Sequence, residues 1–144
     1  MGVIKSSNLC TEIIEYSNKD ETAVCNLASI GLSKFVKEDK TFDYIKLHEV
    51  TKVVANNLNK IIDVNYYPTD KTQRSNFLHR PVGIGIQGLA DVFAMMDLPF
   101  CSDKSKEVNK LIFETMYHAS LEKSNELAIE RCETMMALKK CKEH

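Results

Sequence analysis

The sequence has no long apolar run and no clear excess of one charge. No apolar segment is long enough to cross a bilayer, and no cleavable signal peptide is recognisable, so the cytoplasm is the expected compartment. The formal net charge is -1, which gives no reason to expect nucleic acid or an acidic membrane as a partner. Hydrophobic residues make up 44% of the 144 residues, a share typical of a globular domain.

Closely spaced cysteine pairs are absent too. The chain has five cysteines, an odd number, and none of them forms a Cys-x-x-Cys pair. A disulfide scaffold is therefore not expected, and no metal site is expected either. In a reducing compartment a cysteine is usually a small buried hydrophobe or a reactive group, so its surroundings decide between the two. The five are Cys10, Cys25, Cys101, Cys132 and Cys141.

No internal repeat, low-complexity stretch or Gly/Pro/Ser-rich linker divides the chain, so a single domain is predicted. The order of elements is strand, strand, helix, strand, helix, helix, which favours an α/β fold class without distinguishing a barrel from an open sheet. The expected segments are 7–14 and 23–32 (strands or extended, with a polar turn at 18–21 between them), 43–63 (helix), 82–86 (strand), 88–96 (helix) and a long helix after 102.

Apolar spacing predicts which faces of the two longer helices are buried. The stripe of the first comprises Leu47, Val50, Val53, Val54, Leu58, Ile61 and Ile62. Ser102 or Asp103 can cap the final helix. Its inner face should carry Val108, Leu111, Ile112, Met116 and Ala119, and its charged residues, which we expect in solvent, are Lys104, Lys106, Lys110, Glu122 and Lys123.

The segment around Cys10 is the one that suggests chemistry. In an extended backbone, side chains alternate, so Asn8, Cys10 and Glu12 would share one face. A thiol can act as a nucleophile or hydrogen-atom carrier, a carboxylate can take a proton, and an amide can hold a polar substrate. The alternative is that the cysteine is a packing residue and that the amide and carboxylate mark a solvent face.

Four motifs in order resemble the large subunit of class I ribonucleotide reductase. They are SNLCTEI at 7–13, AVCNLAS at 23–29, NLNKIIDVNYYP at 57–68 and HRPVGIGIQGLAD at 79–91. The resemblance runs from about Val3 to about Glu130 and covers a small part of the family's longer chain. It implies that the chain is part of the family's ten-stranded α/β barrel, with a partial catalytic barrel domain at 1–131 and a divergent C-terminal tail at 132–144.

The resemblance also implies roles for individual residues. Cys10 matches the thiyl-radical cysteine that removes the hydrogen atom from C3′ of the ribose, and Glu12 matches the carboxylate that takes the proton of the 3′-hydroxyl. Asn8 matches the amide that orients the reacting hydroxyls, and Cys25 matches one half of the redox pair that reduces C2′. Asn8, Leu9, Cys10 and Glu12 are the expected substrate contacts.

The implied activity is reduction of ribonucleoside diphosphates to 2′-deoxyribonucleoside diphosphates for DNA replication. No cofactor is expected on this segment, because in this family a metal-containing small subunit supplies the radical and thioredoxin or glutaredoxin supplies electrons. A large-subunit dimer is also implied. The partner cysteine of Cys25, the family's paired relay tyrosines and its C-terminal cysteine pair are not in this sequence, so the isolated chain is expected to be inactive.

Two other hypotheses remain open. The chain could be a truncated, non-catalytic remnant that at most pairs with an intact large subunit. The glycines at 83, 85 and 88 also match G-x-G-x-x-G, with Asp103 about twenty residues on, which is the pattern of a nicotinamide-binding turn. Of the remaining polar motifs, His79 and Arg80 are interpreted as a helix end, and Tyr66 and Tyr67 as packing residues before a proline.

Overall fold

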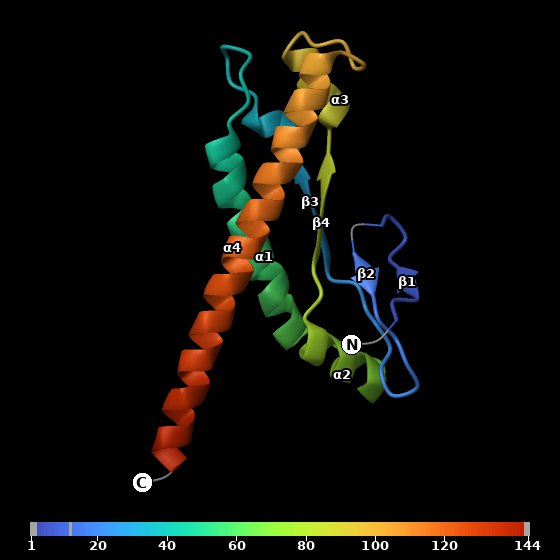
Figure 1. Cartoon of the computed structure of the whole chain (residues 1–144), viewed down its shortest axis with the longest axis vertical. Coiled ribbons are helices and arrows are strands. Elements are labelled where there is room, and N and C mark those ends of the chain that lie inside the picture. Colours follow the sequence, from blue (N-terminus) through green and yellow to red (C-terminus); the bar gives the residue numbers. More distant parts are fainter. Residues whose placement is uncertain (1–2, 12, 143–144) are drawn as a thin grey trace.

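The computed structural model describes residues 3–11 and 13–142, with side chains described as far as Cys132. Two long helices lie side by side and cover a short parallel sheet, while an N-terminal hairpin and a short helix lie at one end (Figure 1). The elements are β1 (Ser6–Ser7), β2 (Ile14–Glu15), β3 (Leu27–Gly31), η1 (Leu32–Phe35), α1 (Tyr44–Val64), α2 (Asp70–His79), β4 (Gly83–Gln87), α3 (Leu89–Met95) and α4 (Asp103–Lys142).

The sheet shows the α/β character that the order of elements predicted. β3 and β4 pair in parallel, from Leu27 opposite Gly83 to Gly31 opposite Gln87. A parallel pair needs a crossover connection, and here the crossover contains α1 and α2. The described residues place only these two strands in the parallel sheet, and two strands cannot close a barrel. The fold class is therefore confirmed as far as a mixed helix and strand architecture.

The core lies between the two long helices, β3, η1 and α3. Its fully buried members include Leu32, Leu47, Val92 and Ile112. The predicted inner face of α4 is confirmed except at Leu111, which is 37% exposed because it sits about 100° around the helix from Ile112. The same geometry leaves Val53 and Ile61 exposed on α1.

The ends of the long helices follow from local sequence. The Asp43 carboxylate accepts a hydrogen bond from the backbone nitrogen of Lys46, and α1 stops at Asn65, just before Tyr66-Tyr67-Pro68. At the start of α4, Ser102 Oγ accepts a hydrogen bond from Ser105 N at 3.1 Å. The cap predicted at Ser102 is confirmed for α4, and the cap of α1 at Asp43 was not predicted.

Only the end of α2, at His79 and Arg80, was predicted from the sequence, and the rest of the helix was not. Its ten residues lack an apolar stripe, because the side chains it buries are polar: Thr72, Ser75 and Asn76. A capping box starts it, in which the side chains of Thr69 and Thr72 each bond the other's backbone nitrogen. No helix within the described residues is both long and apolar enough to cross a membrane.

Candidate functional site

Cys10 lies in the loop between β1 and β2, residues 8–13, which we call the cysteine loop. The two strands pair antiparallel, Ser6 with Glu15 and Ser7 with Ile14. Asn8 is buried inside the loop, where its side-chain Oδ1 accepts a hydrogen bond from Ile13 N at 3.0 Å. Its backbone nitrogen donates to Ile13 O at 3.4 Å and its backbone oxygen accepts from Thr11 N at 3.1 Å. Asn8 thus holds Thr11 and Ile13, two of the other described residues of the loop, in place.

The loop is turned rather than extended, which corrects the expected alternation of side chains. Asn8 is buried, whereas Leu9 is 99% exposed and Cys10 is exposed. Thr11 takes a left-handed backbone conformation with φ 66°, and this reverses the chain. Asn8 and Cys10 therefore do not share a face. Glu12 lies outside the described residues, so its predicted role stays a prediction.

The second predicted cysteine contacts the same hairpin. Cys25 Sγ donates a hydrogen bond to Glu15 Oε1 at 2.7 Å, and Glu15 belongs to β2, the strand that leaves the cysteine loop. Sequence reasoning did not single out Glu15, because its contact with Cys25 joins segments ten residues apart through a turn. The thiol of Cys25 is thus fixed against the hairpin that presents Cys10.

A polar cluster fastens the chain between the two cysteines to α2. Asn18 closes the predicted turn, accepting from Asp20 N and Glu21 N through its side-chain oxygen. The buried carboxylate of Glu21 lies 2.6 Å from His79 Nε2, and the Tyr16 ring meets the His79 ring edge-on at 5.9 Å. His79, at the end of α2, therefore anchors both ends of this turn.

A buried pair of amides then positions the start of β3. Asn26 Nδ2 donates to Asn76 Oδ1 at 2.6 Å and to the backbone oxygen of Pro81 at 2.8 Å. Asn76 Nδ2 donates in turn to Asn26 Oδ1 and to the hydroxyl of Tyr67. Because Asn26 directly follows Cys25, this network fixes the position of Cys25 just before β3. The packing interpretation is right for Tyr67 and wrong for Tyr66, which is exposed.

Arg80 ends α2, as predicted, and its side chain is bound rather than solvated. It takes a left-handed conformation at the helix end, with φ 47°. Its guanidinium donates to both carboxylate oxygens of Asp63, at 2.8 and 2.9 Å, and to Asn59. The hydrogen bond from Arg80 lowers the pKa of Asp63 below its ordinary value. This pair joins the end of α1 to the end of α2.

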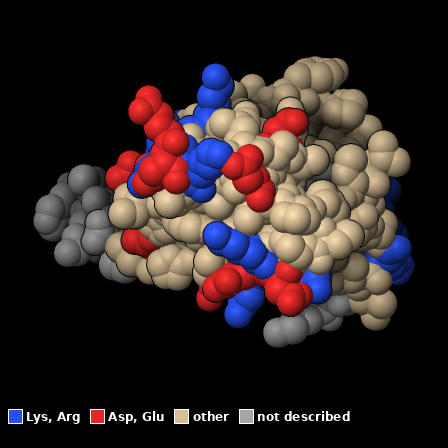
Figure 2. Space-filling view, turned by 90° about the horizontal axis from the view of Figure 1, so that it is seen from above, with Lys and Arg blue, Asp and Glu red and all other residues tan. Residues whose placement is uncertain are grey.

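The surface charge is mixed, in keeping with the net charge. On the face in Figure 2, Lys and Arg lie next to Asp and Glu, and a broad area of other residues separates the charged groups. The final helix departs from its predicted charged, solvated face at Glu122, which lies 3.0 Å from His48 and 3.2 Å from Lys52 of α1. Lys123 pairs with Glu126 at 3.1 Å.

The glycine pattern does not form a dinucleotide-binding turn. Gly83 and Gly85 lie within β4 and pair with β3, whereas the glycines of such a turn follow the strand. Gly88 precedes α3 with φ 75°, where a Cβ would meet Asp91 Oδ2 at 3.1 Å. The glycines are therefore explained by strand pairing and by the tight start of α3.

The fold and the loop together define a class: an α/β chain that presents one cysteine on a turn and holds a second against the same hairpin. Residues 1–140 match the family model described as "Ribonucleotide reductase, barrel domain", and the chain belongs to this family. The family resemblance inferred from the four motifs is thereby confirmed.

Curated relatives agree with the family model. The chain is 62% identical over 128 residues to the ribonucleoside-diphosphate reductase large subunit of Caenorhabditis elegans, covering 89% of this chain and 16% of that protein. It is 60% identical over 128 residues to the ribonucleoside-diphosphate reductase large chain of Schizosaccharomyces pombe, with the same coverage of 89% and 16%. The chain thus spans about one sixth of the length of these relatives.

Proposed function

We propose that this chain carries the radical-cysteine loop of a ribonucleoside-diphosphate reductase. The observation that supports it is the cysteine loop itself: an exposed thiol on a turn that Asn8 holds in shape, in a chain of the ribonucleotide reductase family. In this function β3 and β4 are two neighbouring strands of a ten-stranded α/β barrel. The loop projects into that barrel, where surrounding segments exclude water.

In the proposed reaction, Cys10 as a thiyl radical takes the hydrogen atom from C3′ of a ribonucleoside diphosphate, while Glu12 takes the proton of the 3′-hydroxyl. The two thiols of Cys25 and a partner cysteine outside this sequence supply two electrons and two protons, so that the 2′-hydroxyl group leaves as water, a hydrogen takes its place at C2′, and the two sulfurs become a disulfide. Cys10 then returns its hydrogen atom to C3′ and Glu12 returns the proton to the 3′-oxygen. The radical is regenerated, and the net change is a hydroxyl replaced by hydrogen, with one water and one disulfide formed.

Asn8 has two tasks in this proposal. It orients the reacting hydroxyls of the substrate, and it fixes the turn through the hydrogen bond from Ile13 N to its Oδ1. A rigid turn matters because a reacting atom displaced by about 1 Å costs on the order of a hundredfold in rate. Leu9, which is 99% exposed at the tip, supplies apolar contact to the substrate beside Cys10.

The proposed partners follow from the family. A metal-containing small subunit delivers the radical, thioredoxin or glutaredoxin reduces the disulfide, and the large subunit works as a dimer in the cytoplasm. No cofactor is held by the cysteine loop in this proposal, because the radical arrives from the small subunit. The relatives' printed names, which specify ribonucleoside-diphosphate reductase, support diphosphates as the substrates.

A chimera tests the function directly. The 128-residue segment of the Schizosaccharomyces pombe large chain that matches is replaced by this chain, and deoxyribonucleotide formation is measured with the small subunit and a reductant. We expect turnover that Cys10→Ser abolishes. Cys101→Ser, which removes another exposed thiol, is the matched control and should leave turnover intact.

The alternative function, a non-catalytic remnant, has its own outcome in this experiment. If the chimera folds and dimerises but makes no product, the segment has lost the catalytic chemistry. Turnover that survives Cys10→Ser would remove the radical role from Cys10.

A further inference from the structure

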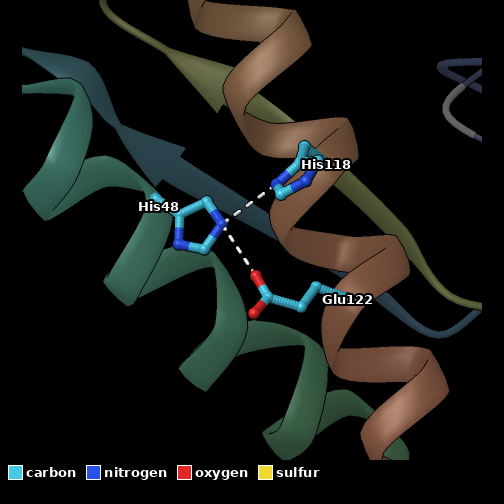
Figure 3. Close-up of side chains that lie close together, drawn as sticks. All are labelled: His48, His118 and Glu122. Atoms are coloured by element: carbon cyan, nitrogen blue, oxygen red, sulfur yellow. Dashed lines mark hydrogen bonds and ion pairs between the residues drawn. The ribbon is translucent and has the colours of Figure 1, made fainter.

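A cluster of side chains with metal-binding chemistry lies between α1 and α4. His48 extends from α1, and His118 and Glu122 extend from successive turns of α4 toward it (Figure 3). His48 Nε2 lies 3.2 Å from His118 Nδ1 and 3.0 Å from Glu122 Oε2. One ligand atom from each of the three residues lies within 4.8 Å of the other two.

These separations suit a small divalent cation. In a tetrahedral zinc site, nitrogen and oxygen ligands lie about 2.0–2.1 Å from the metal, so neighbouring ligand atoms are roughly 3.3 Å apart. The two distances from His48 Nε2, 3.2 and 3.0 Å, are close to that separation between neighbouring ligand atoms. Two of the three separations thus match a tetrahedral site, and the third is at most 4.8 Å.

The backbone already holds the ligands in place. His118 and Glu122 are four residues apart, so they lie one turn apart on the same face of α4. α1 and α4 pack against each other through the core, to which α1 contributes the fully buried Leu47 and α4 the fully buried Ile112. The site is thus built on two rigid elements, as a metal site of fixed geometry requires.

The surroundings provide access and a favourable charge. An open hollow beside the cluster is lined by His48 and His118 together with Glu49 and Glu114, so two further carboxylates face the approach. One cation opposes the metal: Lys52 Nζ lies 3.2 Å from Glu122 Oε1. Lys52 also pairs with Glu126, so it keeps a carboxylate partner when Glu122 turns to the ion.

We propose that His48, His118 and Glu122 form a zinc-class metal site that joins α1 to α4, with the fourth position open to water. Two imidazoles and one carboxylate favour Zn²⁺ and similar transition metals over Mg²⁺ or Ca²⁺, which prefer all-oxygen ligands. The site is separate from the cysteine loop and does not depend on the proposed reductase function. It was not predicted from the sequence, because two of its ligands, His48 and His118, are 70 residues apart and meet only when α1 and α4 pack together.

The test is Zn²⁺ binding to the full chain after its cysteines have been alkylated, with His144→Ala as the background, so that thiols and the terminal histidine cannot bind the ion. Calorimetry should show one saturable equivalent. His118→Ala and Glu122→Gln should each weaken binding by about tenfold or more. Loss of a group that hydrogen-bonds a ligand already lowers metal affinity by about that factor, and loss of the ligand itself should lower it at least as much. Both residues are at least partly exposed, so both variants should fold.

Glu114→Gln is the matched control, because Glu114 lies on α4 and lines the same hollow without being a ligand. It should keep the affinity within about twofold. Co²⁺ in the same background should give the visible spectrum of a four-coordinate site, which His48→Ala removes. No saturable Zn²⁺ binding, or binding unchanged in both His118→Ala and Glu122→Gln, would overturn the proposal.

Discussion

Asn26 and Asn76 place two side-chain amides in the interior, where each satisfies the other. Asn76 is fully buried, and Asn26 is nearly so. Removing the Asn26 amide takes a hydrogen bond from Asn76 Oδ1 and another from the carbonyl of Pro81, and it leaves the Asn76 amide with its bond to Tyr67 alone. A buried polar group that loses its partner costs far more than the partner's net contribution in the intact protein. The position of Cys25 therefore depends on the side-chain amides of this pair.

We expect Asn26→Ala to lower the free energy of unfolding by about 1–3 kcal/mol, measured by urea denaturation. Asn57→Ala, at an exposed position of α1, should change it by less than about 0.5 kcal/mol. The loosened start of β3 should also speed alkylation of Cys25 relative to Cys101. Equal losses in the two variants would contradict the role assigned to the amide pair.

The Asp63–Arg80 pair predicts a particular dependence of stability on pH. Its folded pKa is lowered from the ordinary 3.8, with the Arg80 hydrogen bond as the main cause. A lowered carboxyl pKa stabilises the fold fully above the unfolded value, and that contribution is lost as the pH falls through the folded value. Because Asp63 is 46% exposed, screening keeps the contribution to about 1 kcal/mol or less.

Asp63→Asn should therefore lower the melting temperature at pH 7, and its difference from the unchanged chain should shrink as the pH falls below about 4. Thermal melts followed by circular dichroism from pH 7 to pH 2 measure this. Glu38→Gln, a change at an exposed loop carboxylate, serves as the control and should change the melting temperature little. A constant difference for Asp63→Asn over the whole range would show that the pair does not titrate as argued.

Among whole elements, α4 shows how sharply the buried side of a helix is separated from its exposed side. Ile112 is completely buried, and its neighbour Leu111 is 37% exposed. Ile112→Ala should cost about 2–5 kcal/mol of unfolding free energy, since it leaves a cavity in the core. Leu111→Ala should cost about 1 kcal/mol, since it removes little buried surface. Urea titration of both variants checks the pair, and comparable losses would place the inner face of α4 elsewhere.

Helices with an apolar stripe were predictable over their whole length, whereas only the end of α2 was predicted. The spacing of Leu47, Leu58 and Ile62 predicted α1 nearly to the residue, because a helix that buries one face repeats every 3.6 positions. α2 buries Ser75 and Asn76 instead. The side chain of Asn76 can be buried because it is hydrogen-bonded to Asn26, which lies fifty residues away in the sequence. A single sequence without contacts cannot show such a pairing.

The family was predictable from the residues around Cys10, whereas the shape of the cysteine loop was not. The motif around Cys10 indicated the family, which the comparisons confirm, but not the turn. Thr11, a β-branched residue that rarely takes positive φ, reverses the chain and buries Asn8 while exposing Cys10. Local propensity argues against that conformation, so only the surrounding hydrogen bonds reveal it. Glu15 was missed for the same reason, because its contact with Cys25 depends on the turn.

At the scale of the whole molecule, the exposure of the cysteine loop decides what the chain does by itself. Radical chemistry needs a site from which water is excluded, and here Leu9 and Cys10 are open to solvent. The relatives are about six times longer than this chain, since it covers 16% of them. We therefore expect the isolated chain, given the small subunit and reductant, to form no deoxyribonucleotide. Product that disappears with Cys10→Ser would contradict this.

The same exposure predicts a change in reactivity when the loop enters a full-length chain. In the isolated chain, Cys10 should react with iodoacetamide at close to its rate in denaturant, because nothing in the described fold covers its thiol. In the Schizosaccharomyces pombe chimera the barrel should cover the loop and slow the reaction by about tenfold or more, since alkylation then requires local opening. Mass spectrometry of the Cys10 peptide gives both rates, each referred to the denatured chain to cancel intrinsic reactivity. If the two alkylation rates are equal, the loop is still exposed to solvent in the longer chain. Cys10 then lacks the water-excluded site that the thiyl-radical role requires, and that role is contradicted.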